Sequence, residues 1–533
     1  MKSKIILFIA SMAIMAASCK EDFLNNPSVT SPTSDIYYET PDQVNGATGM
    51  LYNIAWNDWS DKAFTSVGDV LGGTVTGVAG NAQYNSFYNF NIQSTDGLIA
   101  ATWNACYDAA GRASVLISTF EDKKSKVSGN TDYLTRGVAE ARFIRAFAYF
   151  YIGRTFKDAP IVPDPLELTK PGKNLVPRHL QKDVLRFAIE DLKFAEENLA
   201  ATASQPGRVT KMSAKALMSK IYLYLKDYDN AKAKAKEVID YANANPSVVG
   251  LYPNYQEMFT SSKANNNKES LFSLQWLVSM SWNGANRFMT YAGPAPLLRP
   301  APTSTTAGYS SVVPSLDMLN PTTGYYVGDK RRDGSVMQHG FFRADWVNNN
   351  FPKGFKYDTT GATDNFKIRT GTRSNIQKYM VGPNRATEAV NTDAHSSMGT
   401  YIVRYADVLL IYAEAVLKGT GSTSDATALS AYNAVHERAG LPKVTTFSMD
   451  DLLHERKVEF AFEGDYWFDI QRQGFAKAKQ MIESQERGTL NDNGVLTSFK
   501  ASISSESQLF LPIPQRETVT NPLLLEAAVP FYK

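Results

Sequence analysis

Residues 209–245 read VTKMSAKALMSKIYLYLKDYDNAKAKAKEVIDYANAN and contain the clearest repeat unit in the chain. Apolar and small residues recur there at tetratricopeptide spacing, at Met218, Ser219, Tyr222, Tyr228, Ala231, Ala235 and Val238. The small side chains of Ser219 and Ala231 allow two antiparallel helices to approach closely, and 226–228 supplies the turn between them. The stretch therefore predicts a tetratricopeptide-like helix pair. On periodicity alone, a plain helix hairpin of an α-rich domain remains the alternative.

The same helical periodicity continues on both sides of this pair. Helices are expected upstream at 131–156 and 180–199, and downstream at 405–417, 426–439 and 449–463. These segments lie far apart in the sequence but share one pattern. We therefore expect a mainly α-helical protein with a single body over 35–533.

The composition changes between 246 and 397, where Gly, Pro, Asn and Thr become frequent and aromatic runs are short. Strands are expected there only at 271–277 and 378–380. The body thus divides into an N-terminal helical part (35–245), an irregular, loop-rich insertion (246–397) and a C-terminal helical part (398–533). We expect the ligand-binding region in the insertion, because binding residues gather on loops that a rigid scaffold carries.

The N-terminus predicts a lipoprotein. Lys2 and Lys4 precede an apolar run at 5–17, which is typical of a secretory signal peptide and too short to span a bilayer. The run ends in Ala-Ala-Ser-Cys at 16–19, which resembles a lipobox with Ala in place of the usual Leu. We expect 1–18 to be a signal peptide, Cys19 to be lipidated and 19–34 to be a flexible tether. A secreted protein with an incidental Cys19 is the alternative.

Composition excludes several classes of protein. The 55 Lys and Arg residues nearly balance the 53 Asp and Glu residues, so no nucleic-acid partner is expected. The two cysteines, Cys19 and Cys106, allow neither a disulfide framework nor a Cys-rich metal site. The histidines show no metal-ligand spacing, and no Walker or Gly-x-Ser-x-Gly motif is present. We expect no metal and no cofactor, and Cys106 as a small buried residue.

Carbohydrate recognition needs flat aromatic faces for the C–H side of a sugar ring and planar polar groups for its hydroxyls. Aromatic and amide residues interleave at 81–91, interpreted as a loop, and at 279–291. The candidate binding residues are Tyr84, Tyr88, Trp282, Asn283, Arg287, Tyr291, Tyr309 and Trp346. The alternative for each aromatic is burial. Burial is the expectation for Trp103, Trp276 and Trp467.

An acidic helix face in the C-terminal part has two interpretations. Glu455, Glu459 and Glu463 lie four residues apart, so they could be the carboxylate pair of a glycoside hydrolase. Basic and acidic neighbours, Arg456, Asp469 and Arg472 among them, favour a buried ion-pair network instead. The same interpretation applies to Arg142 and Arg145 on the helix expected at 131–156.

Several segments, in this order, resemble the SusD/RagB family of surface lipoproteins. They are EARFIRAFAYF at 140–150, DAP at 158–160, RYADVLL at 404–410, ERAGL at 437–441, ERKVEFAFEG at 455–464 and LPIP at 511–514. The resemblance spans nearly the whole chain. One departure is Lys157, where the family commonly has glycine.

The resemblance implies a SusD-like fold with tetratricopeptide-like helix pairs on one side and an irregular ligand-binding region on the other. It implies a non-catalytic protein, anchored by lipid to the outer membrane and facing the cell exterior. Such proteins capture an oligosaccharide and act as a lid on a SusC-like TonB-dependent transporter for nutrient uptake. A peptide-capturing member of the family, and a surface glycoside hydrolase, are the alternatives.

Overall fold

A computed structural model describes residues 37–77, 82–298, 308–360, 368, 370–383, 394–419 and 421–532. The expected signal peptide and tether, with Cys19, lie outside these residues.

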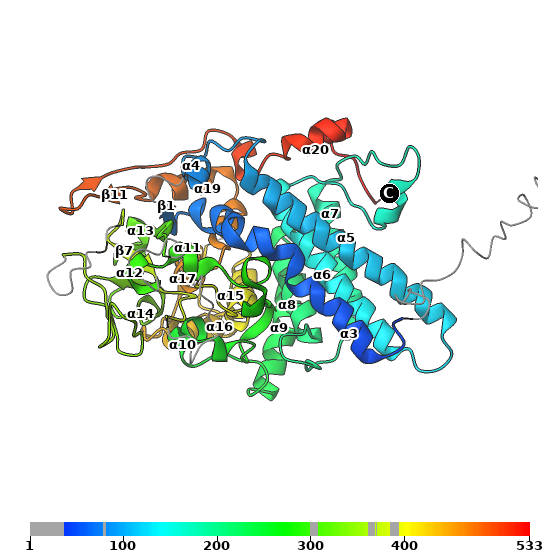
Figure 1. Cartoon of the computed structure of the whole chain (residues 1–533), viewed down its shortest axis with the longest axis horizontal. Helices are drawn as coiled ribbons and strands as arrows, with labels where there is room; N and C mark the ends of the chain where they lie inside the picture. Colours follow the sequence, from blue (N-terminus) through cyan, green and yellow to red (C-terminus); the bar gives the residue numbers. More distant parts are fainter. Residues whose placement is uncertain are drawn as a thin grey trace, which may run out of the picture.

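The long helices of the N-terminal half form a stack in which each packs against the next. These helices are α5 (Gly97–Lys126), α6 (Asp132–Phe156), α7 (Gln181–Asn198), α8 (Lys211–Tyr224) and α9 (Tyr228–Ala244). In Figure 1, α5 and α6 run side by side across the right half of the molecule. The helices expected at 131–156 and 180–199 are confirmed.

Helices α8 and α9 are the predicted tetratricopeptide-like pair. The Thr210 and Ser213 side chains cap the start of α8, and the Asp227 side chain accepts from the Asn230 amide at the start of α9. Such caps satisfy amides that have no partner within the helix. Ser219 and Ala231 are both fully buried, as close packing of the two helices requires.

The stack resumes after the insertion. Helix α15 (Tyr405–Leu417) packs against α9, and α16 (Ala426–Arg438) and α17 (Met449–Glu459) pack against α15. Segments separated by about 160 residues thus form one continuous layer of helices.

Helix α17 ends four residues before the expected end at 463. The Asp69 carboxylate accepts hydrogen bonds from the backbone amides of Phe462 and Gly464, each at 2.9 Å. Both residues have positive φ, 67° and 71°. A carboxylate nearly 400 positions away in the chain therefore holds this turn out of the helical conformation, and the expectation for 460–463 was wrong.

Shorter helices complete the α-helical content. They are α3 (Pro41–Gly49), α4 (Ala82–Tyr88), α10 (Tyr255–Thr260), α11 (Phe288–Ala292), α12 (Ala295–Leu298), α13 (Leu316–Leu319), α14 (Arg331–Ser335), α18 (Tyr466–Gln471), α19 (Phe475–Ser484) and α20 (Gln515–Thr520). The 3₁₀ turns η2 (Ile54–Trp56) and η7 (Val278–Asn283) and the π-helical turns η3 (Trp59–Ala63) and η4 (Ser66–Val70) recur below.

The strands of the described residues form only two-stranded antiparallel sheets. The pairs are β1 (Val75–Gly77) with β3 (Val312–Pro314), β2 (Ser270–Leu274) with β8 (Thr400–Arg404), β4 (Val336–Gln338) with β7 (Ser374–Ile376), β5 (Phe342–Arg343) with β6 (Phe355–Lys356), β9 (Ser422–Thr423) with β10 (Phe447–Ser448) and β11 (Thr489–Leu490) with β12 (Leu496–Thr497). Strand β2 confirms most of the strand expected at 271–277. The strand expected at 378–380 was wrong: Tyr379 has φ 64°, and the Met380 amide donates to the Gln377 carbonyl across a turn.

Most of the insertion lies between two adjacent strands, β2 and β8. In the β2–β8 pair, Phe272 lies opposite Val403. Trp276, just after β2, donates from its indole nitrogen to Thr400 at 2.9 Å and is 4% exposed, so its predicted burial is confirmed.

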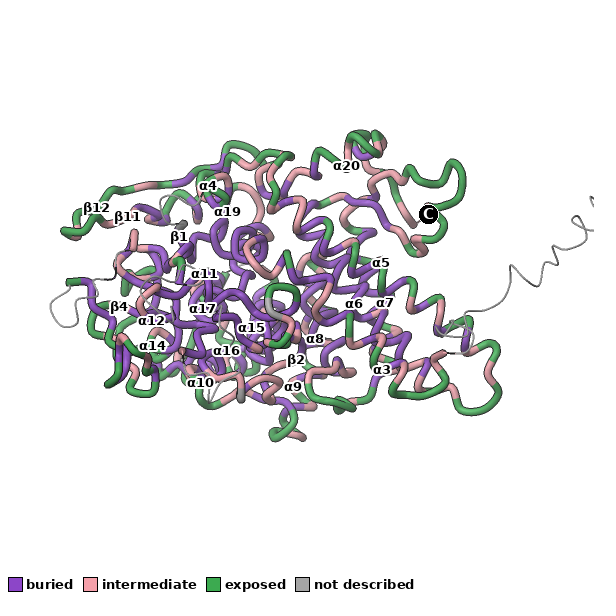
Figure 2. Tube along the Cα trace, in the orientation of Figure 1, coloured by how far each residue is buried: buried purple, intermediate pink, exposed green. Residues whose placement is uncertain are grey.

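The three parts of the chain share one core, which Figure 2 shows as buried backbone through the centre of the molecule. A Cβ atom at Gly68 would lie 2.0 Å from the Gly464 carbonyl group, so only glycine allows η4 to approach the turn after α17. Trp103, Trp467 and Cys106 are buried in this core as expected. Burial raises the pKa of the Cys106 thiol, which keeps it protonated.

Candidate functional site

The acidic helix face of α17 lies inside the protein. Glu455 and Glu459 are at most 1% exposed and Glu463 is 5% exposed. The Arg404 guanidinium contacts Glu459 at 2.9 Å and Glu463 at 2.8 Å, and Arg331 contacts Glu455 at 2.6 Å. These carboxylates line no open cleft, so they have no access to a glycosidic bond.

Neighbouring arginines keep Glu459 ionised. Burial alone would raise the pKa of Glu459, but the guanidinium groups of Arg438, Arg404 and Arg331 outweigh burial and hold that pKa far below its ordinary value. Removing one member would leave the others as uncompensated buried charges.

A second set of ion pairs ties α17 to α15 and α18. Arg456 contacts Asp407 at 2.8 Å and Asp469 at 2.9 Å, while Arg472 contacts Asp469 at 2.9 Å and pairs with Glu414. All five residues are buried or nearly so. These charges fix how the helices pack.

Two arginines on α6, Arg142 and Arg145, also form ion pairs that join neighbouring helices. Arg145 forms a two-pronged ion pair with Asp191 of α7, at 2.7 and 2.8 Å. Arg142 lies 3.8 Å from the same carboxylate and 4.2 Å from the centre of the Phe194 ring. The pair joins α6 to α7.

Two of the candidate binding aromatics lie in the core. Tyr84 and Trp346 are each 1% exposed, so neither ring has a face available to a ligand. The loop interpretation was wrong for 82–88, because these residues form helix α4, which buries Tyr84 and Phe87. The spacing of three residues between those two rings was the signal for a helix. Trp346 packs against Phe355, with the Arg343 guanidinium 4.8 Å from its indole centre.

Tyr88 is half-buried and lies apart from the other candidates. Its ring stacks on Phe499 with centroids 4.6 Å apart, and its hydroxyl donates to the Arg487 carbonyl. Both contacts are with the C-terminal part of the chain. This arrangement secures the end of α4 against the C-terminal part.

Trp282 is 39% exposed and is held in place on several sides. The Asn57 side-chain amide donates to the Trp282 carbonyl at 3.0 Å, and Arg287 donates to the Asn57 carbonyl at 3.0 Å. The Arg287 guanidinium lies 5.5 Å from the indole centre, and the His395 ring meets it edge-on at 4.4 Å. An aromatic face fixed before binding loses little conformational entropy when a ligand stacks on it.

A pair of tyrosines is connected to this tryptophan through Arg287 and Asp61. Tyr291 is 8% exposed and Tyr309 is 41% exposed, with ring centroids 5.9 Å apart. The Lys62 ammonium lies 4.9 Å from the Tyr291 ring centre and bonds to the Gln83 side chain at 2.9 Å. Burial and then the nearby Asp61 carboxylate raise the pKa of Tyr291, so its hydroxyl stays protonated.

Asp61 links the two aromatic groups. Its carboxylate lies 3.6 Å from the Arg287 guanidinium, and Asp58 lies 3.5 Å from the same group. Burial raises the pKa of Asp61 to about 6, against the opposing effect of Arg287 and Lys62. We call Trp282, Asn283, Arg287, Tyr291 and Tyr309, with Asn57, Asp58, Asp61 and Lys62, the Trp282 face.

Sequence analysis missed the contribution of 57–62 to this face. The segment reads NDWSDK and lies between Trp56 and Ala63, which are both fully buried. It spans the π-helical turn η3, whose spacing differs from the ordinary helical period. The run of polar residues around Trp59, between the apolar Trp56 and Ala63, was the available signal.

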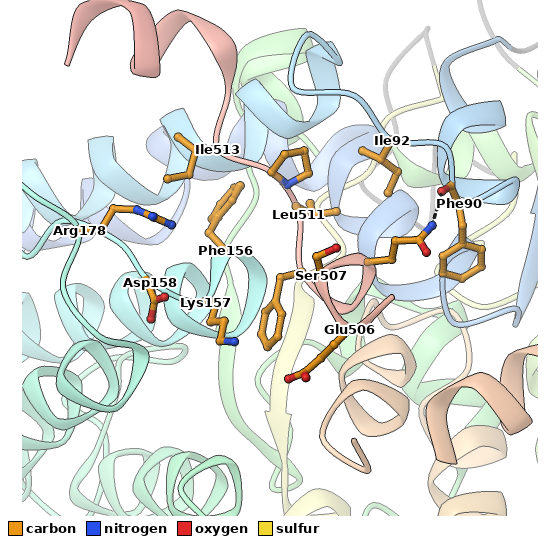
Figure 3. A pocket seen from close by; sticks show the side chains of 13 residues that line it. Phe90, Ile92, Phe156, Lys157, Asp158, Arg178, Glu506, Ser507, Leu511 and Ile513 are labelled. Carbon is orange, nitrogen blue, oxygen red and sulfur yellow. Dashed lines mark hydrogen bonds between the residues drawn. The ribbon is translucent and has the colours of Figure 1, made fainter. Parts of the chain in front are cut away.

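A separate hollow of about 530 Å³ lies at the C-terminal end of α6 (Figure 3). Its walls come from Phe90, Phe156 and the segment 506–513, with Lys157 and Arg178 at the edge. Its lining contains phenylalanines but neither tryptophan nor tyrosine. Among the described candidates, only those of the Trp282 face combine exposed rings with several amide and carboxylate groups.

Two further observations concern metal binding and membrane crossing. Across the described ranges, no group of three His, Cys, Asp or Glu side chains is arranged to hold a metal ion. None of the helices in the described part combines the length and the apolar character that crossing a bilayer requires.

Comparison with protein families gives two matches that together cover most of the chain. The model described as "SusD family" matches residues 268–532, and one described as "Starch-binding associating with outer membrane" matches 22–223. The chain belongs to the SusD/RagB family. A "SusD-like protein" of Bacteroides ovatus is 29% identical over 100% of this chain and 98% of its own length, and "SusD-like protein P2" of Formosa agariphila is 27% identical over 72% of this chain and 73% of its own.

Solved structures share the mainly α-helical SusD-like fold. A protein crystallised with xylogluco-oligosaccharide superposes with a TM-score of 0.77 at 27% identity, covering 92% of this chain and 99% of that one. A laminarin-binding SusD-like protein, 23% identical, superposes with a TM-score of 0.70 over 93% of this chain and 100% of that one. The fold class expected from the sequence is confirmed.

Proposed function

We propose that this protein is a non-catalytic glycan-binding protein and that the Trp282 face is its binding surface. The observation that carries the proposal is the fixed, part-exposed indole of Trp282, bordered by side chains that hydrogen-bond to hydroxyl groups. Such a platform meets the C–H face of a sugar ring, while Asn283 and Asp58 meet its hydroxyls.

The comparisons support this ligand class. One family match carries a starch-binding description, and the xylogluco-oligosaccharide complex belongs to a relative 27% identical to this chain. A surface glycoside hydrolase has less support, because the acidic face of α17 is buried and ion-paired. One platform and a few hydrogen bonds give dissociation constants of about micromolar to millimolar, roughly 4 to 8 kcal/mol.

The cellular role follows from the family and from the N-terminal sequence. The protein would be held at the outer membrane by lipid on Cys19, would face the cell exterior, and would close as a lid over a SusC-like TonB-dependent transporter. Retention under a lid would compensate for modest affinity. Labelling of intact cells and co-purification with the transporter test this role, and labelling only after lysis would contradict it.

Binding is tested on residues 20–533 by affinity electrophoresis and calorimetry. The probes are xyloglucan, laminarin, polygalacturonate and casein peptides. Trp282→Ala should weaken binding at least about tenfold, equivalent to about 1.4 kcal/mol. Tyr326→Ala is the matched control, because Tyr326 is 38% exposed but stacks on His454, away from this face.

Each outcome decides a separate point. Glycan binding that is unchanged in Trp282→Ala would remove the Trp282 face from the proposal. Binding of the peptides alone would assign the protein to the peptide-capturing branch of the family.

A further inference from the structure

A hollow of about 680 Å³ opens beside the Trp282 face, between the first turns of α5 and the 3₁₀ turn η2. Its volume lies within the range of ordinary small-molecule sites, ~300–1,000 Å³. Small residues make much of its wall, namely Ala55, Gly97, Ala100, Ala101 and Ala105. Because these side chains are short, the backbone of α5 is open to a flat ring.

Apart from Ile54, polar side chains make the remainder of the lining: Asn57, Asp58, Asn104, Asp108 and Asn283. Asn104 and Asn283 are exposed, and within the described ranges neither side-chain amide makes a hydrogen bond. Asp108 pairs with Arg112 on the next turn at 2.8 Å, and both side chains are 44% exposed. Asp58 is 85% exposed, with Arg287 at 3.5 Å. The lining therefore offers free amides and accessible carboxylate oxygens.

The hollow and the Trp282 face share structural elements. Asn283 lines the hollow and follows Trp282 directly in η7. Asn57, which is 8% exposed, lines the hollow and also donates to the Trp282 carbonyl. A chain of sugar units stacked on Trp282 can therefore continue past Asn283 into the hollow.

We infer that this hollow is a second carbohydrate subsite, which receives units of an oligosaccharide next to those stacked on Trp282. The inference rests on the proposed function and adds the chemical class of the ligand. Amides and carboxylates both bond to hydroxyl groups. Arg112 and Arg287 balance the charges of Asp108 and Asp58, so the lining carries no excess positive charge to attract uronate or sulfate groups. The ligand of this pair of subsites is a neutral glycan that is long or branched enough to reach both.

The test fills the hollow without touching Trp282. Ala101 is half-buried on α5, so Ala101→Leu adds bulk at a position that tolerates it and keeps high helix propensity. Ser118→Leu, on an exposed position of the same helix, is the matched control. Asn104→Ala is a second variant, which removes a free amide without adding bulk. Thermal unfolding checks that all three remain folded.

The probes are xyloglucan and laminarin, which are neutral, and polygalacturonate, which is acidic. On the neutral glycan that wild type binds, Ala101→Leu should weaken binding at least about tenfold and Asn104→Ala about three- to tenfold, as expected for one lost hydrogen bond. Ser118→Leu should bind as wild type does, and polygalacturonate should bind weakly or not at all.

The possible results separate the subsite from the proposed function. If Trp282→Ala abolishes binding while Ala101→Leu and Asn104→Ala bind as wild type does, the second subsite is wrong and the proposed function stands. Tight binding of polygalacturonate would overturn only the inference that the ligand is a neutral glycan. If wild type binds none of the glycans, the proposed function fails, and the subsite fails with it.

Discussion

Two regions of this molecule differ in which side chains are buried: charged residues are buried in the C-terminal helices, and an aromatic ring is exposed at the Trp282 face. In the C-terminal helices, Arg404 is 1% exposed and contacts the carboxylates of Glu269, Glu459 and Glu463. At the Trp282 face, the indole is 39% exposed and its backbone is held by one side-chain amide. The stability of a buried charge depends on each of its ion-pair partners, whereas the position of an exposed ring depends on only a few contacts. Substitution should therefore damage folding in the first region and binding in the second.

The largest effect is expected from Glu459→Gln. The change leaves Arg404, Arg438 and Arg331 facing a neutral amide in a dry environment, and breaking such a buried network costs about 3–5 kcal/mol of unfolding free energy. Urea unfolding measures it. Glu121→Gln, on the exposed surface of α5, is the control. A loss below about 1 kcal/mol would show that the network is not what holds these helices together.

Tyr84→Ala should lower stability by about 3 kcal/mol or more, because it leaves a cavity where a fully packed ring was. Tyr84→Phe keeps the ring and should cost much less. Calorimetry at a temperature where the variants are folded should show glycan affinity close to that of wild type. Lost affinity in a folded Tyr84→Phe variant would return this residue to the binding surface.

Asp61→Asn should change how stability depends on pH. Burial raises the pKa of Asp61 to about 6, above its unfolded value near 3.9, so the folded state binds the proton more tightly. The stabilisation is complete below about pH 4 and is lost as pH rises through about 6, by up to about 3 kcal/mol. Urea unfolding at pH 4.5 and 7.5 should show that Asp61→Asn lacks this loss.

The control for that comparison is Asp58→Asn, whose side chain is 85% exposed. Its stability should follow that of wild type at both pH values. Parallel pH profiles for Asp61→Asn and wild type would mean that Asp61 stays ionised through this range.

The smallest effect is expected on the surface of α5. Lys126 and Asp122 form an ion pair at 2.7 Å with both side chains more than half exposed. Asp122→Asn should change the unfolding free energy by less than about 0.5 kcal/mol. A larger change would mean that this end of α5 is more constrained than its exposure indicates.

The helix stack was predictable because apolar and small residues recur at three- and four-residue steps along the helices. This holds whether a helix buries one face, as α7 does, or nearly every residue, as α6 does. The expected helix at 131–156 and the observed α6 (Asp132–Phe156) differ by one residue. The period does not predict a helix end that a distant side chain determines. Asp69 holds the turn that follows α17, and no residue near 460 in the sequence indicates this contact.

The proposed binding surface was predictable in kind but not in detail. Sequence indicated which loop residues have suitable chemistry, and Trp282 and Tyr309 are indeed exposed. It could not tell exposed from buried rings, because exposure depends on partners far away in the chain. Trp346 is covered by Phe341 and Phe355, whereas the neighbours of Trp282 are Asn57 and His395.

The pairing of β2 with β8 has an evolutionary consequence. Because Phe272 lies opposite Val403, the chain leaves the helices and returns to them at a single point. The residues between these strands can vary in length without moving the ends of α9 and α15, provided that Asp317, Arg331 and Lys378 keep their buried ion pairs with the C-terminal part. Among the described strands, the β1–β3 pair is the one strand contact outside β2–β8 that a transplanted segment would have to match. One helical frame can thus carry a changed insertion while 57–62 and α5, which supply the rest of the proposed binding surface, stay in place.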